Sequence, residues 1–245
     1  MAFTLIVPAA GRGTRMETDT PKALVRFKNQ FLIEYSTAGL APFTSEIIIV
    51  VSPTALETFE EVLPSLHGID VKYVEQEKPR GTAEAIQNGI RGASNEMSVI
   101  VWADHVGAHF FGAELLSQCM NTQDWDIIVP MVERSDPYVY FDVDSRERIT
   151  RFYETRTGAP NIKHGKSDCG VFLVRNSVVG DELTRLTTDS ETEVNFLNLI
   201  PIMNKTGLIA RSVLLTDERL TFGANSVADL KMADLQLKSF GEISD

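Results

Sequence analysis

Short apolar runs rich in β-branched residues alternate with longer amphipathic stretches through the first half of this chain. The runs at residues 3–7, 46–51, 71–75, 98–102 and 126–132 are bounded by turn or polar residues and predict strands. The stretches at residues 31–40, 55–66, 82–91 and 113–121 carry apolar residues at helical spacing and predict helices. Strand–helix alternation predicts a mostly parallel sheet with helices on both faces, in a Rossmann-like α/β fold.

The pattern loosens after residue 132. Residues 137–142, 149–154 and 170–174 predict strands, and a polar stretch containing Gly, Pro and Lys joins the second to the third at residues 155–166. Helices are expected again at residues 193–205 and 227–240, with a strand at 208–214 between them. The 245 residues, 43% of them hydrophobic, are expected to form one domain over residues 1–245.

The charge balance narrows the partners that this chain can have. Lys and Arg total 23 against 34 Asp and Glu, and the net charge of -11 argues against binding of nucleic acid or of an anionic membrane. An anionic substrate must therefore be met by a few placed cations. The apolar start at residues 3–10 is too short to span a membrane and follows no basic residue, so we expect a strand there and a cytoplasmic protein. Cys119 and Cys169 lack a metal-binding spacing and are expected to be packing residues.

A loop rich in small residues follows the first predicted strand, with the sequence PAAGRGTRM at residues 8–16 and TPKAL at 20–24. The small residues that let a backbone approach a ligand closely are Ala9, Ala10, Gly11 and Gly13. Backbone amides in such a loop can hold a triphosphate, with help from the cations Arg15 and Lys22. Alternatively, the glycines only shape a connection and the cations are solvated. Met16 stands where a dinucleotide fingerprint has Gly or Ala, and the GxxxxGK[ST] pattern is absent from the loop.

Residues 11–22 closely resemble the signature of the sugar-phosphate nucleotidyltransferase superfamily. The resemblance implies that the glycine loop wraps the nucleotide. It also implies that Arg15 and Lys22 are the catalytic cations, which hold the triphosphate and stabilise charge at the reacting phosphorus.

A second segment, QEKPRGTAEA at residues 76–85, lies where a predicted strand passes into a helix. Gln76 offers a donor and an acceptor to a base edge, Gly81 permits close approach, and the Thr82 hydroxyl can bond to the base or cap the helix. Capping alone explains Gly81 and Thr82 but not Gln76 at this spacing. The segment resembles the element with which uridylyltransferases of this superfamily recognise the pyrimidine base.

Two further positions offer oxygen ligands to a metal. Asp104 follows the predicted strand 98–102, at the edge where open α/β sheets bind their ligands, and Asn225 lies in FGANSVADL at residues 222–230. Each can instead cap a helix. The resemblance implies that both hold Mg²⁺, which favours oxygen ligands and keeps several waters. His105 is given no metal role, because Mg²⁺ prefers oxygen to imidazole.

These segments occur in family order along the chain, and the overall resemblance is to the uridylyltransferase region of bacterial bifunctional N-acetylglucosamine 1-phosphate enzymes. The implied organisation is a nucleotide-binding half at about residues 1–132 and an acceptor-binding subregion at 133–225. Hexapeptide repeats are absent from the sequence, so the acetyltransferase half of those enzymes is not expected.

The activity implied is a Mg²⁺-dependent transfer in which a sugar 1-phosphate attacks a nucleoside triphosphate, UTP by the base segment, and pyrophosphate leaves. No covalent enzyme intermediate is expected. One alternative is a cytidylyltransferase acting on an alcohol phosphate or on phosphocholine, because residues 7–16 and 21–35 also resemble those enzymes. A second is a nucleotide-binding regulatory protein without turnover. The chain is compatible with a homo-oligomer.

The resemblance is partial at the positions implied to touch the acceptor. Glu154 and Glu193 align with family acids near the sugar. Asp168 stands where the family has an Asn, and Phe141 where it has a Gly that approaches the N-acetyl group. A carboxylate only accepts hydrogen bonds, and an aromatic ring fills space that glycine leaves open. An unacetylated or amino-bearing sugar 1-phosphate is therefore expected as the acceptor.

Overall fold

The computed structural model describes residues 2–11, 20–78, 80–188, 192–217 and 222–239. Its strands are β1 (Phe3–Pro8), β2 (Arg26–Phe27), β3 (Gln30–Phe31), β4 (Thr44–Val51), β5 (Ser65–Leu66), β6 (Ile69–Glu75), β7 (Met97–Val101), β8 (Ile127–Ser135), β9 (Val139–Val143), β10 (Ile149–Glu154), β11 (His164–Asp168), β12 (Val171–Arg175) and β13 (Ala210–Leu214). Its α-helices are α1 (Leu32–Ala38), α2 (Leu56–Val62), α3 (Thr82–Gly92), α4 (Ala108–Asn121), α5 (Asn176–Thr188), α6 (Leu199–Thr206) and α7 (Val227–Ser239).

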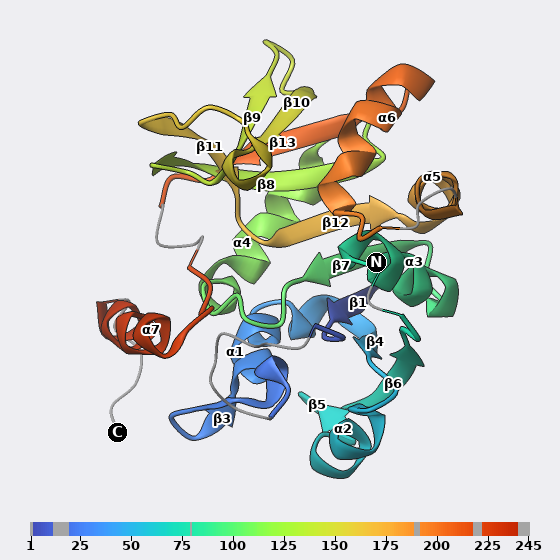
Figure 1. Ribbon diagram of the computed structural model, residues 1–245, viewed down its shortest axis with the longest axis vertical. Helices are drawn as coiled ribbons and strands as arrows, with labels where there is room; N and C mark the ends of the chain where they lie inside the picture. Colours follow the sequence, from blue (N-terminus) through green and yellow to red (C-terminus); the bar gives the residue numbers. More distant parts are fainter. Residues whose placement is uncertain (1, 12–19, 79, 189–191, 218–221, 240–245) are drawn as a thin grey trace.

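One mixed sheet runs through the molecule in the order β10-β9-β11-β8-β12-β7-β1-β4-β6-β5, with β13 beside β8 (Figure 1). The neighbours β7, β1, β4 and β6 are parallel, as the strand–helix alternation predicted. The strands of the second half, β8 to β12, pair antiparallel with their neighbours, while β13 is parallel to β8. The structure confirms the predicted α/β class, and its parallel part is mainly the first half of the chain.

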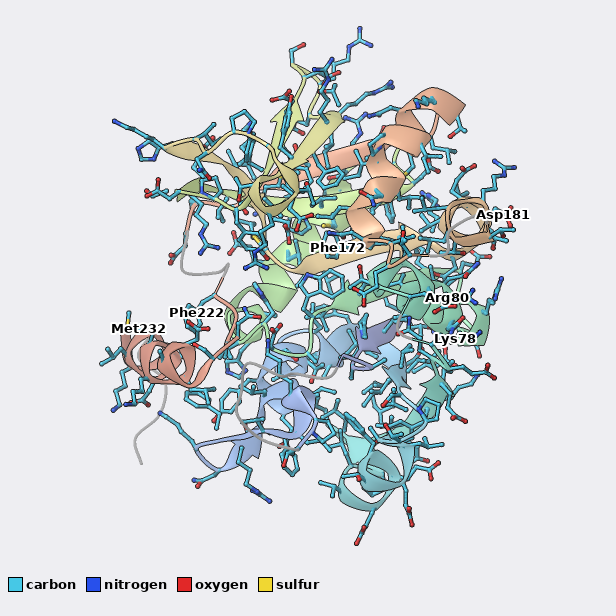
Figure 2. The ribbon with its side chains drawn as sticks, viewed as in Figure 1. Lys78, Arg80, Phe172, Asp181, Phe222 and Met232 are labelled. Carbon is cyan, nitrogen blue, oxygen red and sulfur yellow. The ribbon has the colours of Figure 1, made fainter. Side chains whose placement is uncertain are left out.

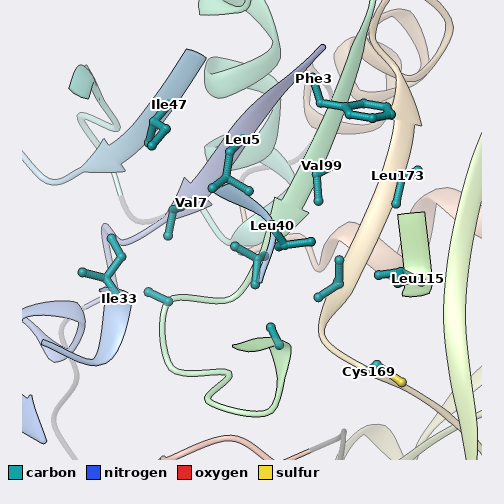
Figure 3. Packing of buried hydrophobic residues seen from close by; sticks show 14 of the residues in the cluster. Phe3, Leu5, Val7, Ile33, Leu40, Ile47, Val99, Leu115, Cys169 and Leu173 are labelled. Carbon is teal, nitrogen blue, oxygen red and sulfur yellow. The ribbon is translucent and has the colours of Figure 1, made fainter. Parts of the chain in front are cut away.

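Helices cover both faces of this sheet because side chains alternate along each strand. In β1, Leu5 and Val7 point into one core, shared with α1, α2 and α4, and Figure 3 shows them beside Val99 of β7. Ile6 points into the opposite core, shared with α3, α5 and α6. Each fully buried aliphatic side chain contributes about 1.5–3 kcal/mol, so these two layers hold the strand ends in place. Within the described residues, none of the helices has both the length and the apolar content needed to cross a membrane.

Several element predictions need correction. The helix predicted at 55–66 ends at Val62, and residues 65–66 form β5, which turns back at His67 and Gly68 with positive φ angles of 53° and 79°. The helix predicted from residue 193 begins at Leu199, after the 3-10 turn η5 (Phe196–Asn198). Strand β11, which begins in the predicted polar stretch 155–166 and extends beyond it, was missed, and so was α5. Residue 240, the predicted end of the last helix, lies outside the described residues.

Helices α1 and α4 meet through two glycines. A Cβ atom built on Gly112 of α4 would lie 2.0 Å from the Gly39 carbonyl oxygen, and one built on Gly39 would lie 2.5 Å from the His109 carbonyl oxygen. The two backbones are therefore in direct contact. Because α1 follows the segment that carries Lys22 and α4 follows Asp104, this crossing fixes the distance between two segments of the candidate site.

Candidate active site

The candidate site lies beyond the carboxyl end of β7. The Trp102 amide donates to the Gly170 carbonyl oxygen at 3.1 Å, and the chain then turns, so that Asp104 lies at the sheet edge. The Ala224 amide donates to the Asp104 carbonyl oxygen at 2.9 Å, which brings the segment before α7 alongside. Asp104 and Asn225, distant in sequence, are therefore neighbours.

Lys22 joins them from the first half of the chain. It opens the 3-10 turn η2 (Lys22–Leu24), whose next two residues, Ala23 and Leu24, are 2% and 3% exposed and anchor the turn in the core. The Lys22 ammonium forms an ion pair with the Asp104 carboxylate and donates to the Asn225 Oδ1 atom at 2.8 Å. The two residues predicted to hold a metal thus converge on one cationic atom.

This donor set fits Mg²⁺. A carboxylate oxygen and an amide oxygen are hard ligands, and both already contact a positive charge at a single point. Across the described ranges no group of three or more His, Cys, Asp or Glu residues gathers as a metal cluster. A Mg²⁺ ion held by Asp104 and Asn225 would take its other ligands from water and from phosphate oxygens, which is how Mg²⁺ commonly binds at phosphate-transfer sites.

The alternative role of Asn225, as the cap of α7, is filled by its neighbour. The Ser226 hydroxyl accepts from the backbone amide of Asp229 at 3.2 Å. The Asp229 carboxylate accepts from the backbone amide of Asn225 at 2.9 Å. The first bond caps the start of the helix, and the second holds the backbone just before it. The side-chain oxygen of Asn225 takes no part in capping and is available to the Lys22 ammonium or to a metal ion.

Two cavities meet at this cluster. The first, of about 370 Å³, is lined by Ala9, Gly11 and Lys22 among others, and the second, of about 740 Å³, extends toward β8 and β11. Both are lined by Trp102, Asp104, Arg156 and Asn225. Phe222, which Figure 2 shows between α7 and the sheet, belongs to the second cavity. Two compartments with a shared wall suit a reaction between two bound molecules.

The structure places part of the predicted triphosphate loop. Ala9 and Gly11 line the first cavity, and the Ala9 amide is held by the Val50 carbonyl oxygen at 2.7 Å. Ala10 lies between them. The predicted catalytic Arg15 and the loop residue Gly13 lie outside the described residues.

The predicted base segment lies at the same sheet edge, across β4 from the loop. The Gln76 amide nitrogen donates to the Gly81 carbonyl oxygen and to Glu84 Oε2, both at 3.0 Å, which leaves the Gln76 amide oxygen as the acceptor. Gly81 has φ +92°, and its Cβ would lie 2.4 Å from the Val194 carbonyl oxygen, so glycine is required there. The Thr82 hydroxyl accepts from the Phe196 amide at 2.9 Å. These three residues are not among those that line the first cavity.

Of the predicted acceptor residues, Asp168 lines the second cavity. Its carboxylate accepts from the Gly170 amide at 2.9 Å, and desolvation by burial raises the pKa of Asp168 although that bond and the charge of Arg134 act against the shift. Glu154, at the end of β10, does not line this cavity, and Glu193 is exposed beside Val194, whose backbone contacts Gly81.

Phe141 requires a correction. It is 5% exposed in the core and packs against Phe152, with ring centroids 6.4 Å apart. Phe141 belongs to the core and is not among the residues that line the second cavity, so it does not fill acceptor space. The expected steric clash between Phe141 and an N-acetyl group is therefore wrong. The expectation that an N-acetylated acceptor binds poorly now depends on Asp168 alone.

Four polar or aromatic residues that line the second cavity could not be identified from the sequence, namely Trp102, Arg134, Tyr138 and Arg156. The Arg156 guanidinium carbon lies 4.7 Å from the centroid of the Tyr138 ring, a cation–π contact. Residues 155–166 were expected to form a polar connection, and a polar composition does not reveal which of its cations lines a cavity. His105, 5% exposed, also lines this cavity, and no metal role is assigned to it.

Comparison with known proteins identifies the family to which this chain is similar. The family described as MobA-like NTP transferase domain matches residues 5–167. The bifunctional protein GlmU of Mycobacterium ulcerans is 23% identical over 243 residues, which cover 95% of this chain and 49% of that protein. The chain thus spans about half the length of the curated relatives that it matches.

Solved structures of other proteins share the fold. The inositol-1-phosphate CTP transferase from T. maritima superimposes with a TM-score of 0.77 at 22% identity, covering 100% of this chain and 98% of that one. HddC from Yersinia pseudotuberculosis superimposes with a TM-score of 0.69 at 16% identity, covering 96% and 99%. At these identities the likeness concerns the fold.

Proposed function

Because this chain belongs to the MobA-like NTP transferase domain family, and so to the nucleotidyltransferases, we propose that it joins UTP to a sugar 1-phosphate with Mg²⁺ and releases pyrophosphate. The observation that carries the proposal is the convergence of Lys22, Asp104 and Asn225 on the wall between two cavities. One cavity adjoins the glycine loop and suits a triphosphate. The other is open for a second substrate.

The reaction follows from this arrangement. An oxygen of the acceptor phosphate attacks the α-phosphorus, a new P–O bond forms, and the bond from that phosphorus to the β-phosphate oxygen breaks with departure of pyrophosphate. The acceptor phosphate is ionised at neutral pH, so no general base is required. Lys22 neutralises phosphate charge, and Asp104 and Asn225 hold Mg²⁺, which supplies further charge neutralisation when bound. The walls of the cavities orient the two substrates.

The preference for uridine rests on the base segment. The Gln76 amide oxygen can accept from the uracil N3–H. Gly81 and Thr82 open α3, and among the described residues their amides have no hydrogen-bond acceptor, so they can donate to the carbonyl oxygens that flank N3. A donor flanked by two acceptors is the edge that uracil presents.

The acceptor is proposed to present a hydroxyl or ammonium group to Asp168. A carboxylate accepts hydrogen bonds and cannot donate them, so a carbonyl of the acceptor would find no partner there. An acceptor that leaves Asp168 unpaired loses about 1–3 kcal/mol of binding. Unacetylated or amino-bearing sugar 1-phosphates fit this wall better than their N-acetylated forms.

A pyrophosphate-release assay tests the proposal. Wild-type protein is incubated with Mg²⁺, each of the four ribonucleoside triphosphates, and glucose, glucosamine, galactose and N-acetylglucosamine 1-phosphates. We expect release with UTP and an unacetylated sugar 1-phosphate, and its loss when a chelator is added. Release with CTP and an alcohol phosphate instead would transfer the assignment to the cytidylyltransferases. No release with any pair would reject turnover.

A further inference from the structure

The wall shared by the two cavities contains one more charged group, which the proposed reaction does not use. Of the four residues that line both cavities, Asp104 is anionic, Trp102 and Asn225 are neutral, and Arg156 is the cation. Lys22 lines the first cavity and is paired with Asp104. Arg156 forms no ion pair with a carboxylate anywhere in the described part of the chain.

We propose that Arg156 binds the phosphate group of the acceptor and holds it at the boundary where it meets the triphosphate, with Tyr138 as the residue that positions Arg156. The proposal rests on the proposed function.

Charge requires a cation at this place. The acceptor phosphate and the α-phosphate are both anionic, yet their reacting atoms must come within about 3–3.5 Å. The chain carries a net charge of -11, so its average field repels both substrates. An arginine on the shared wall, without a carboxylate to neutralise it, offsets that repulsion where the two phosphates meet.

The side chain is also held for the task. The Arg156 guanidinium lies over the Tyr138 ring at 4.7 Å, and the 3-10 turn η4 (Thr155–Thr157) that carries it ends at Gly158, whose φ of +101° turns the chain back. Stacking limits the rotamers of a long side chain and leaves its planar fork of N–H groups free at the edge. Such a fork matches two oxygens of one phosphate.

Arg134 distinguishes this role from general attraction. It lines the second cavity only, beside Asp168, and it too has no carboxylate partner within 4.0 Å among the described residues. If positive charge in the cavity were sufficient, the two arginines would be equivalent. If position at the boundary matters, removal of the Arg156 side chain weakens binding of the acceptor phosphate more than removal of the Arg134 side chain does.

Calorimetric titration tests the proposal without turnover. Glucose 1-phosphate and inorganic phosphate are titrated into protein saturated with a UTP analogue whose α,β-bridge is a methylene group, so that pyrophosphate cannot leave. We expect Arg156→Ala to weaken binding of either probe by about 10- to 100-fold, the loss of a charge-assisted hydrogen bond, and Arg134→Ala to weaken it less. The affinity of Arg156→Ala for the UTP analogue should stay within about twofold of the wild-type value. The Arg156 guanidinium, which stacks on Tyr138, is proposed to bind the acceptor and not the nucleotide.

Two comparisons separate a binding role from a structural one. Arg151→Ala removes an exposed arginine of the neighbouring strand β10 and is the matched control. Tyr138→Leu should raise the KM for the acceptor, because it removes the ring on which Arg156 stacks. Tyr138→Phe keeps the ring and should have a KM close to the wild-type value. In turnover assays with UTP, Arg156→Ala should lower kcat/KM for the acceptor by about 100-fold or more relative to the wild type.

Each result decides the matter. The proposal is overturned if Arg156→Ala binds both probes as the wild type does, if it weakens the UTP analogue instead of the acceptor, or if the wild type binds neither probe. Turnover that persists with unchanged acceptor binding in Arg156→Ala would leave the proposed function in place and remove this inference alone. Arg156-dependent binding without any turnover would remove the proposed function alone.

Discussion

Lys22 is the residue that connects the predicted triphosphate site to the predicted metal ligands, since its ammonium contacts both Asp104 and Asn225. We expect Lys22→Ala to lower turnover by about 10²-fold or more, because one preorganised electrostatic contact is lost. The unfolding temperature should barely change, since Ala23 and Leu24 still anchor the turn. Steady-state kinetics and thermal unfolding check both statements, with the exposed Lys205→Ala as control. Near-normal turnover would remove Lys22 from the phosphate site.

Asp104 is expected to be essential for the metal dependence. Asp104→Asn keeps the shape of the side chain but removes the negative charge that attracts the cation, so Mg²⁺-dependent turnover should be abolished and a chelator should have the same effect on the wild type. Titration with Mn²⁺, followed by its electron paramagnetic resonance signal, measures the metal site directly. An unchanged Mn²⁺ affinity in Asp104→Asn, or activity in metal-free buffer, would contradict the assignment.

Asp168 links stability to pH. Its pKa is raised in the fold, so the ionised carboxylate is the disfavoured form. The cost to stability is absent below the unfolded-state pKa of about 3.9 and grows as pH rises through the folded-state pKa. Asn is neutral and still accepts from the Gly170 amide, so Asp168→Asn should raise the unfolding temperature at pH 7.5 by about 2 °C or more and give a smaller gain at pH 4.

Thermal unfolding at the two pH values checks this, with the exposed Asp181→Asn as the matched control. A gain for Asp168→Asn that is the same at both pH values, or a loss at pH 7.5, would show that burial of the charge is not what governs this side chain.

Residues fixed by local motifs could be predicted, and those brought in by tertiary folding could not. Asp104 was found because a carboxylate after a buried strand is visible in the sequence, and the structure places it with Lys22 and Asn225. Arg156 reaches the cavity only because η4 turns back at Gly158 and Tyr138 supports the guanidinium. Phe141 was misplaced because an alignment does not tell which face of β9 turns inward.

At the scale of elements, the crossing of α1 and α4 depends on the absence of a side chain at Gly112. Gly112→Ala would place a methyl group 2.0 Å from the Gly39 carbonyl oxygen, so the helices must separate, at a cost of about 1–3 kcal/mol. Gly180→Ala, in α5, is the matched control, since its Cβ would meet only Ile90 Cγ2 at 3.2 Å. Both changes gain the same helix propensity, about 1 kcal/mol.

Urea unfolding compares the two variants. We expect the free energy of unfolding to fall in Gly112→Ala and to stay close to the wild-type value or rise in Gly180→Ala. Equal stabilities would mean that the helices tolerate the added methyl group, and the account of how Lys22 and Asp104 are held together would be wrong.

The elements that the sequence predicted are those whose apolar content reveals them. The parallel strands are continuous apolar runs, so they were found. Strand β11 reads HGKSD, with no large apolar side chain, and is held by its register with β8. Helix α5 contains Gly180 and several β-branched residues of low helix propensity, and it is stabilised by burial of Val179 and Leu183 against the sheet. Tertiary contacts therefore decide both elements.

At the scale of the whole molecule, one sheet supports two cavities whose shared wall carries Asp104, Asn225 and Arg156. The first half of the chain supplies the glycine loop and Lys22. The second supplies Asp168, Arg156 and, through the segment before α7, Asn225. The predicted division into a nucleotide half and an acceptor half remains a proposal, and the two cavities support it.

The central claim is that an acceptor phosphate attacks the α-phosphorus of a nucleoside triphosphate. Isotope tracing tests it most directly: the protein is incubated with Mg²⁺, glucose 1-phosphate and UTP labelled with ³²P at either the α- or the γ-position, and the products are separated by charge. The account predicts α-label in a nucleoside diphosphate sugar and γ-label in pyrophosphate. Transfer of the γ-label to the sugar phosphate, or its release as orthophosphate, would contradict the account.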